Sequence, residues 1–229
     1  MIKLEHTVLP SPEQMQFVIE GMRNPMNSHS KSDSFLVPSG YTDDPPEFDL
    51  GDNDHTLMLK LAKAGRDHRK YLRMMPVYVR ITAPLYWWKE FDTYKVGTVA
   101  NSCSTMHKIA EKEFVIDDFS NEHLDLDNYD LLKQTISRLN HYREIYINGG
   151  MVEYPDCGRQ IFEPKNKRIW WQMIQLLPSS YNQTRNVMLN YEVLANIYAS
   201  RQGHKLDEWR EFCKWIETIP MHELIIEAV

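Results

Sequence analysis

The sequence predicts an α+β fold that is mainly helical and contains a small sheet. Two observations support this class: apolar residues recur at helical spacing in several segments, whereas residues 75–82 alternate apolar and polar side chains as a strand does. With 229 residues, 42% of them hydrophobic, the chain is long enough to bury a substantial core, and no linker-like composition interrupts it. A single domain over residues 1–229 is therefore expected.

Helix-start and loop residues place the N-terminal elements. Ser11 followed by Pro12 is typical of a helix start, and apolar residues continue the helix as far as Met22. Residues 24–54 are rich in Asn, Ser, Asp, Pro and Gly, which predicts a long irregular loop. Loops of that length are usually functional or mobile.

A helix that opens at Asp54 and stops at Gly65 leads into a basic turn over residues 66–73 and then into the strand 75–82. The turn contains Arg66, His68, Arg69, Lys70 and Arg73. Runs of charge usually form solvated turns. In a chain of net charge −6, however, a local concentration of cations would also suit an anionic ligand, so both interpretations stay open.

Apolar periodicity predicts further helices over residues 127–150, 168–177 and 206–219. The first ends at two glycines and suggests no chemistry. In the second, Trp170 and Trp171 are interpreted as core or subunit contacts. The third presents one apolar face made of Trp209, Phe212, Cys213 and Ile216.

Asn190, Asn196 and Arg201 form a row of polar side chains in the apolar segment after Pro178. Proline ends the preceding helix, and from about Thr184 apolar residues return at helical spacing, so one helix is expected to carry the whole row. The row covers about three turns and could follow a long ligand. The alternative is that the asparagines satisfy nearby backbone groups while Arg201 meets the negative end of the helix dipole.

The composition argues against several classes of function. A net charge of −6 disfavours nonspecific binding to a nucleic-acid polymer, which needs a basic stripe, although free nucleotides remain compatible. Cys103, Cys157 and Cys213 are odd in number and widely spaced, so neither a disulfide framework nor a metal site is predicted. No signal peptide and no apolar run of about 18 residues is recognised, so no membrane association and a cytoplasmic location are expected.

The C-terminal half resembles the flavin-dependent thymidylate synthase family, in which Leu-Pro is followed by a Tyr, an Asn-x-Arg, a further Asn and a Leu-Arg. The corresponding residues here are Leu177, Pro178, Tyr181, Asn190, Asn196 and Arg201. The resemblance implies that the two asparagines contact FAD and that Arg201 binds the dUMP substrate. Glu192 departs from the pattern, because the family has an arginine there.

The middle of the chain resembles the signature of the same family, Arg-His-Arg-x-x-Ser-x-Asn-Glu-x-Ser-x-Arg-Tyr, in degenerate form. Residues 83–91 resemble the segment that precedes the signature, and with one inserted residue Tyr94, Lys95, Asn101, Ser102 and Ser104 fall on signature positions. Thr93 and Met106 stand where the family has arginines, which removes two bidentate phosphate ligands. Glu90 stands where the family has a glutamine. A carboxylate only accepts hydrogen bonds from a substrate base, whereas an amide can also donate one.

The resemblance implies the family's fold, with a small antiparallel sheet, and its chemistry over roughly residues 54–217. Members transfer a one-carbon unit from methylene-tetrahydrofolate to C5 of dUMP and reduce it with hydride from FAD, which NADPH recharges. The implied cofactor-binding residues are Asn190, Asn196, Lys95, Tyr94, His68 and Arg69. The implied substrate-binding residues are Arg201, Glu90, Asn101, Ser102 and Ser104, of which Ser104 and Arg201 are the catalytic candidates. A homotetramer is implied as well.

Other functions stay open beside this one. Loss of the two arginines and the acidic Glu90 would suit a different pyrimidine nucleotide, or hydroxymethylation in place of methylation. A chain that kept the fold and lost the flavin would instead be a non-catalytic nucleotide-binding or assembly module. A helical interaction protein unrelated to the family is a third alternative.

Overall fold

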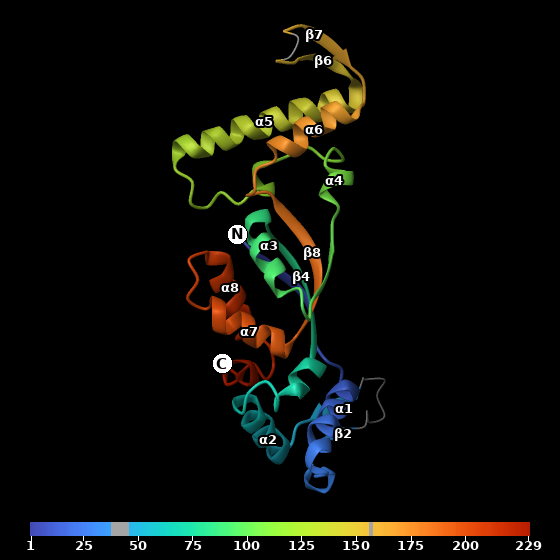
Figure 1. Ribbon diagram of the computed structural model, residues 1–229, viewed down its shortest axis with the longest axis vertical. Helices are drawn as coiled ribbons and strands as arrows, with labels where there is room; N and C mark the ends of the chain where they lie inside the picture. Colours follow the sequence, from blue (N-terminus) through green and yellow to red (C-terminus); the bar gives the residue numbers. More distant parts are fainter. Residues whose placement is uncertain (38–45, 156–157) are drawn as a thin grey trace. The chain divides into compact units, whose positions relative to one another are not determined.

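Figure 1 shows the computed structural model of the chain, which describes residues 1–37, 46–155 and 158–229. Its strands are β1 (Lys3–Val8), β2 (Phe35–Val37), β3 (Glu47–Asp49), β4 (Pro76–Pro84), β5 (Val99–Ser102), β6 (Gly150–Glu153), β7 (Gln160–Glu163) and β8 (Asn182–Asn190). Its α-helices are α1 (Pro12–Arg23), α2 (Asp52–Lys63), α3 (Leu85–Phe91), α4 (Thr105–Lys108), α5 (Leu126–Asn148), α6 (Lys167–Leu176), α7 (Tyr191–Arg201), α8 (Asp207–Ile216) and α9 (Glu223–Ile226). Helices dominate the described backbone, which confirms the mainly helical α+β class.

The chain groups into two compact units. Unit 1 consists of Met1, Thr82–Glu90 and Ser102–Arg185, and unit 2 consists of Ile2–Ile81, Phe91–Asn101 and Asn186–Val229. A four-stranded sheet has the strand order β1-β4-β8-β5, and the pairs β2–β3 and β6–β7 each form a separate antiparallel two-stranded sheet. The single domain expected over residues 1–229 stays a prediction.

The N-terminal helix α1 begins as its sequence predicts. Ser11 accepts a hydrogen bond from the backbone N–H of Gln14, the Gln14 side chain accepts one from the Ser11 N–H, and Pro12 occupies the first turn. Met15, Val18, Ile19 and Met22 form its buried face. The capping residues and the apolar stripe agree, so the helix is defined locally.

The long irregular loop predicted over residues 24–54 is wrong for part of that segment. Antiparallel strands β2 and β3 lie within it, and the connection between them, residues 38–45, falls outside the described residues. Helix α2 also starts earlier than predicted, at Asp52, with Gly51 as its N-cap. Polar residues such as Ser32 and Ser34 gave this segment the composition of a loop, but both hydroxyls bond to Asp54, about 20 residues further along the chain.

Asp54 is fully buried and collects those contacts. Its carboxylate pairs with the guanidinium of Arg23 at 2.5 Å and accepts hydrogen bonds from the hydroxyls of Ser32 and Ser34, each at 2.7 Å. The N–H groups of Asp33 and Ser34 add two further bonds at 3.1 Å. Asp54 therefore fastens residues 32–34 to α1 and α2 within unit 2, instead of capping a helix.

The pKa of Asp54 makes this contribution to stability depend on pH. Burial favours the neutral acid, but hydrogen bonds from Ser32, Ser34 and Arg23 outweigh burial and hold the pKa below its ordinary value of 3.8. A carboxyl group with a depressed folded-state pKa stabilises the fold above its unfolded pKa, and this stabilisation is lost as pH falls through the folded pKa. We expect Asp54→Asn to lower the free energy of unfolding by about 2 kcal/mol at neutral pH. Denaturant unfolding at pH 7 and below pH ~4 checks this, because the difference from wild type should shrink in acid and a constant difference would contradict the assignment.

Strand β4 confirms the strand predicted from alternation at residues 75–82. Val77, Val79 and Ile81 are buried, whereas Tyr78 and Arg80 between them are exposed. The period of two therefore gave both the element and its buried face.

Unit 1 has an apolar core beneath the paired helices α5 and α6, which lie side by side in Figure 1. Phe114, Phe119, Leu139 and Met173 are among its buried residues. A second cluster, which includes Ile145, Val152 and Ile169, carries this core to the β6–β7 hairpin. The helices predicted over residues 127–150 and 168–177 are confirmed, each within two residues at either end.

The prediction that one helix carries Asn190, Asn196 and Arg201 is wrong. Residues 182–190 form strand β8, in which buried Val187 and Leu189 alternate with more accessible neighbours, and helix α7 begins only at Tyr191. The apolar positions on either side of residue 190 also fit helical spacing, which is why the sequence suggested a helix. Asn196 and Arg201 thus share α7, and Asn190 is its N-cap.

Helix α8 confirms the last predicted helix, with Trp209, Phe212, Cys213 and Ile216 buried on one face. It packs against α7, which also contacts α9, within unit 2. In the part of the chain that the structure describes, no helix has the length and apolar character needed to cross a bilayer.

Candidate functional site

Arg201, in the last turn of α7, is held by two aromatic side chains of unit 2. Its Nε donates a hydrogen bond of 2.9 Å to the hydroxyl of Tyr94. The guanidinium carbon lies 4.7 Å from the centre of the Trp209 ring and 5.7 Å from that of Tyr94. Arg201 is half-buried, so these cation–π contacts are partly shielded from water. Its guanidinium is therefore oriented before any ligand arrives.

The rings around Arg201 belong to a larger aromatic cluster. Trp209 is fully buried, stacks on Phe91 with an interplanar angle of 14°, and meets Tyr94 edge-on with ring centres 5.9 Å apart. Phe212, on the same face of α8 as Trp209, completes the cluster. Tyr94 ends the short 3₁₀ helix Asp92–Tyr94, and Lys95 follows as an exposed residue. The segment that resembles the family signature thus contributes Tyr94 to the surroundings of Arg201.

Asn190 has a structural task at the start of α7. Its side-chain oxygen accepts the N–H of Val193 at 3.0 Å, so the carbonyl half of the amide caps the helix. Gly97 packs against this start with φ of +91°, and a Cβ there would lie 3.0 Å from the Val193 side chain. The alternative interpretation, that Asn190 forms a hydrogen bond with a nearby backbone group, is therefore correct for its side-chain oxygen.

Asn196 binds a side chain instead. Its oxygen accepts a hydrogen bond from Arg66 at 3.2 Å, which brings a second guanidinium to α7. Arg66 is exposed and belongs to the basic turn that precedes β4. The sequence showed that the turn is basic, but it contained no signal that Arg66 would contact a residue 130 positions away.

Glu192 and Arg69 form a buried ion pair in unit 2. Arg69 Nε lies 2.8 Å from one carboxylate oxygen of Glu192, and Nη2 donates to the other at 3.2 Å. Both residues are at least 93% buried, and Arg69 also donates to the backbone carbonyl of Ala228. The negative charge where the family has an arginine is therefore matched by a cation of the same unit. Arg69, predicted to bind the cofactor, is engaged here, whereas its neighbour His68 is exposed.

The remaining predicted residues fall in both units. Asn101 belongs to unit 2, whereas Glu90, Ser102 and Ser104 belong to unit 1. Asn101, Ser102 and Ser104 are exposed, and Glu90 is half-buried at the end of α3. Ser104 is the N-cap of α4, where its hydroxyl oxygen accepts the N–H of His107 at 3.3 Å.

The residues next to Ser104 have partners that the sequence reasoning missed. Gln183 on β8 donates to the carbonyl of Cys103 at 3.1 Å and contacts the Thr105 hydroxyl at 3.0 Å, and it also accepts from Arg185. Arg185 lies over the ring of Trp88 at 4.2 Å. The sequence predicts a helix from about Thr184 and not a strand that includes Gln183 and Arg185, so it gives no sign that these residues approach residues 103–105.

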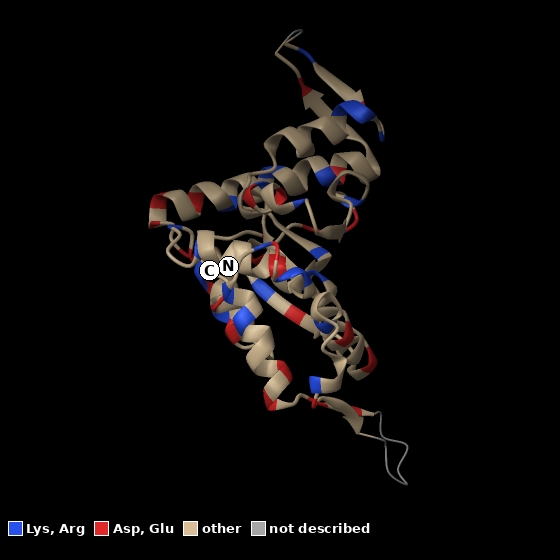
Figure 2. Ribbon diagram, turned by 60° about the horizontal axis from the view of Figure 1, so that its bottom comes forward, with Lys and Arg blue, Asp and Glu red and all other residues tan. Residues whose placement is uncertain are grey.

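Two of the three cysteines belong to the described residues. Cys103 is exposed, and Cys213 is buried with its thiol pKa raised to about 11 by burial and by nearby Glu217. Cys157 lies outside the described residues. No group of three or more His, Cys, Asp or Glu in the described ranges is arranged to hold a metal ion. Figure 2 shows acidic and basic residues interspersed along the elements.

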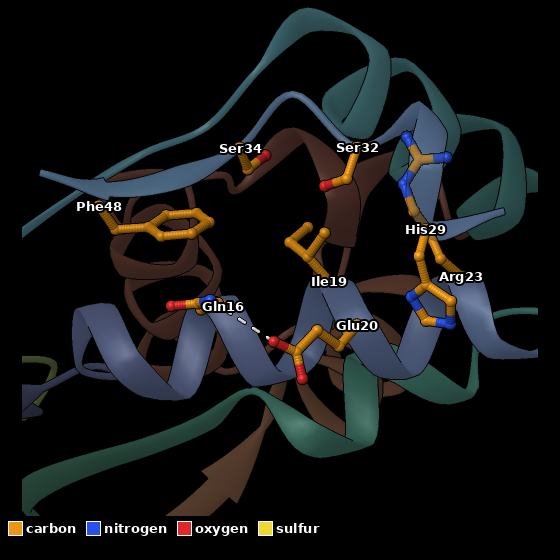
Figure 3. A pocket seen from close by; sticks show the side chains of 8 residues that line it. All are labelled: Gln16, Ile19, Glu20, Arg23, His29, Ser32, Ser34 and Phe48. Atoms are coloured by element: carbon orange, nitrogen blue, oxygen red, sulfur yellow. Dashed lines mark hydrogen bonds between the residues drawn. The ribbon is translucent and has the colours of Figure 1, made fainter.

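A cavity of about 200 Å³ opens in unit 2 beside α1 (Figure 3). Its lining consists of Gln16, Ile19, Glu20, Arg23, His29, Ser32, Ser34 and Phe48. None of the predicted site residues lines it. Arg23 and both serines are already bonded to Asp54, so the polar wall of the cavity belongs to the Asp54 network.

Comparisons with known proteins address the fold. No protein-family model and no curated protein matches the sequence. Two solved structures of thymidylate synthase X from Helicobacter pylori, both with FAD and dUMP, superpose on this chain with TM-scores of 0.62 and 0.60, each at 14% sequence identity. Both alignments cover 100% of this chain, and they cover 98% and 99% of the respective Helicobacter chains. A UMP/dUMP methylase, PolB from Streptomyces cacaoi, bound with 5-Br dUMP, gives a TM-score of 0.55 at 12% identity, covering 100% of this chain and 94% of its own. Over its full length, the chain has the fold of the flavin-dependent thymidylate synthases.

Proposed function

We propose that the protein is an FAD-dependent pyrimidine nucleotide methyltransferase that transfers a one-carbon unit from methylene-tetrahydrofolate to C5 of dUMP or a related pyrimidine nucleotide. The observation that carries this proposal is the preoriented guanidinium of Arg201 between Tyr94 and Trp209, in a chain whose whole length matches the fold of enzymes crystallised with FAD and dUMP. Fold alone does not define an activity, and the retained arginine is what links this fold to a nucleotide.

Arg201 is assigned to the nucleotide phosphate. A guanidinium offers parallel N–H donors to phosphate oxygens, and here Tyr94 and Trp209 limit its rotation, so less conformational entropy is lost on binding. By the resemblance, Asn101, Ser102 and Ser104 are assigned to the nucleotide as well. Glu90 supplies an acceptor where the family has an amide, which favours a substrate edge that presents N–H groups.

The donors near α7 suit a flavin with its pyrophosphate. Arg66, His68 and Lys95 are exposed nitrogen donors, and Asn190 and Asn196 add amide groups at the start and middle of α7. When bound, FAD would supply the hydride chemistry, recharged by NADPH, and the protein would bind and orient the reactants. Arg69 is left out of this set because Glu192 neutralises it. We include a homotetramer in the proposal, and a native mass measurement tests it.

The test is the binding of FAD and of a panel of pyrimidine monophosphates. We expect purified protein to show flavin absorbance, or to acquire it when FAD is added, and dUMP to bind more tightly than CMP. No FAD binding at high micromolar concentration would contradict the enzymatic proposal and favour the non-catalytic nucleotide-binding or assembly module. The control is the same titration with a variant in which Asn190 and Asn196 are both replaced by alanine. Its affinity for FAD should be lower than that of the wild type.

A second candidate reaction is hydroxymethylation of another pyrimidine nucleotide. The observation that favours it is the replacement of the family's glutamine and two arginines by Glu90, Thr93 and Met106. Mass analysis of the product formed with methylene-tetrahydrofolate, with and without NADPH, distinguishes a methyl from a hydroxymethyl group. A product that forms equally without any reductant would favour hydroxymethylation.

A further inference from the structure

Residues 103–105, which flank Ser104, are fastened to β8 by one side chain. The Gln183 amide nitrogen donates to the Cys103 carbonyl at 3.1 Å and to the Thr105 hydroxyl at 3.0 Å. The backbone adds a bond of 3.1 Å from the Cys103 N–H to the Thr184 carbonyl. All of these residues belong to unit 1. Both residues that flank the exposed Ser104 are thus bonded to β8.

Arg185 and Trp88 fix the direction in which Gln183 points. Arg185 Nε donates to the Gln183 side-chain oxygen at 3.0 Å, and because a guanidinium only donates, the amide must turn its oxygen to Arg185 and its nitrogen to residues 103–105. Arg185 in turn lies 4.2 Å above the ring of Trp88. Trp88 is 1% exposed, and its indole N–H donates to the Gln183 carbonyl at 2.9 Å. A buried ring therefore supports the whole arrangement.

We infer that Gln183 is a positioning residue that holds Ser102 and Ser104 in the geometry required to bind the pyrimidine nucleotide, and that Arg185 on Trp88 keeps Gln183 in its donating orientation. This inference rests on the proposed function, because Ser102 and Ser104 are assigned there to the nucleotide. Gln183 itself acts through Cys103 and Thr105, so its replacement should change substrate affinity and leave FAD affinity unchanged.

The decisive variant is Gln183→Glu in the full-length protein. The carboxylate keeps the shape of the side chain and still accepts from Arg185, but it cannot donate to Cys103 or Thr105. We expect hydrogen–deuterium exchange in the peptide containing residues 102–108 to become at least about tenfold faster, and the dissociation constant of dUMP to rise about tenfold, with that of FAD unchanged. Thr105→Val, which removes one acceptor, should give a smaller change in the same direction. Gln175→Ala, an exposed glutamine on α6, is the matched control and should change neither quantity.

The two readouts separate the inference from the proposed function. If wild-type protein binds dUMP and Gln183→Glu binds it equally well, the positioning role is overturned while the proposed function stands. Unchanged exchange in residues 102–108 overturns it too, whatever the ligand data show. If wild-type protein binds neither FAD nor any pyrimidine monophosphate, the proposed function fails, and a role toward substrate fails with it. Equal losses of FAD and dUMP affinity would indicate a general structural effect and overturn the assignment.

Discussion

Glu192→Ala should lower the free energy of unfolding by about 3–5 kcal/mol, because it leaves the buried guanidinium of Arg69 without its counter-ion. The substitution also removes an acidic side chain from the first turn of α7, where a negative charge interacts favourably with the helix dipole. For a chain of this size, such a loss corresponds to a fall of about 10 °C or more in melting temperature. Thermal and urea unfolding of the wild type and the variant measure it.

A surface ion pair of the same unit provides the control. Lys63 and Glu227 are 2.7 Å apart, but their side chains are 58% and 44% exposed, so Glu227→Ala should cost no more than about 1 kcal/mol. The double replacement of Arg69 by Met and Glu192 by Leu should recover much of the loss, since a buried pair can often be exchanged for apolar residues. A melting temperature for Glu192→Ala within about 2 °C of wild type would show that the pair does not stabilise the fold.

Glu192→Arg restores the residue type of the resembling family and is expected to be more harmful than alanine. It would place two guanidinium groups together in a buried site, where like charges repel strongly. The departure at residue 192 therefore cannot be understood from that position alone, because it is coupled to Arg69, 123 residues earlier.

Local signals were sufficient for several elements. Ser11 and Pro12 define the start of α1, alternation defines β4, and the apolar face of α8 follows from Trp209, Phe212 and Ile216. In each case the information lies within the element itself. Capping, period and burial agree there, so sequence was enough.

Strand β8 shows where local information fails. Its apolar residues fit either a strand or the first turns of a helix, and the choice is made by pairing with β4 and β5, which are distant in sequence. The contacts of the candidate site are also non-local: Arg201 meets Tyr94 across 107 residues, and Gln183 meets Thr105 across 78. The resemblance identified Arg201, but periodicity carries no record of such partners.

The largest effect on ligand binding is expected for Arg201→Ala. It should raise the dissociation constant of dUMP about 100-fold, because charge-assisted hydrogen bonds to the phosphate are lost. Arg201→Lys should recover only part of the affinity, because an ammonium group is a point charge and cannot form the parallel pair of bonds. Tyr94→Phe keeps the ring beside the guanidinium and removes the acceptor of Arg201 Nε, so a loss of about threefold to tenfold is expected. Calorimetric titrations with dUMP give all three values.

The same variants separate the nucleotide from the flavin. If Arg201 contacts the phosphate of dUMP, its replacement should change FAD affinity by no more than about threefold, because only the local packing with Tyr94 and Trp209 is disturbed. Arg138→Ala, at an exposed arginine on α5, removes a positive charge without touching the aromatic cluster and should leave both affinities unchanged. A parallel loss of FAD and dUMP affinity in Arg201→Ala would indicate a general structural effect and would contradict the assignment of Arg201 to the nucleotide phosphate. An unchanged dUMP affinity in Arg201→Ala would contradict the assignment of Arg201 to the nucleotide. The proposed function would then rest on the fold alone, and a fold does not select a ligand.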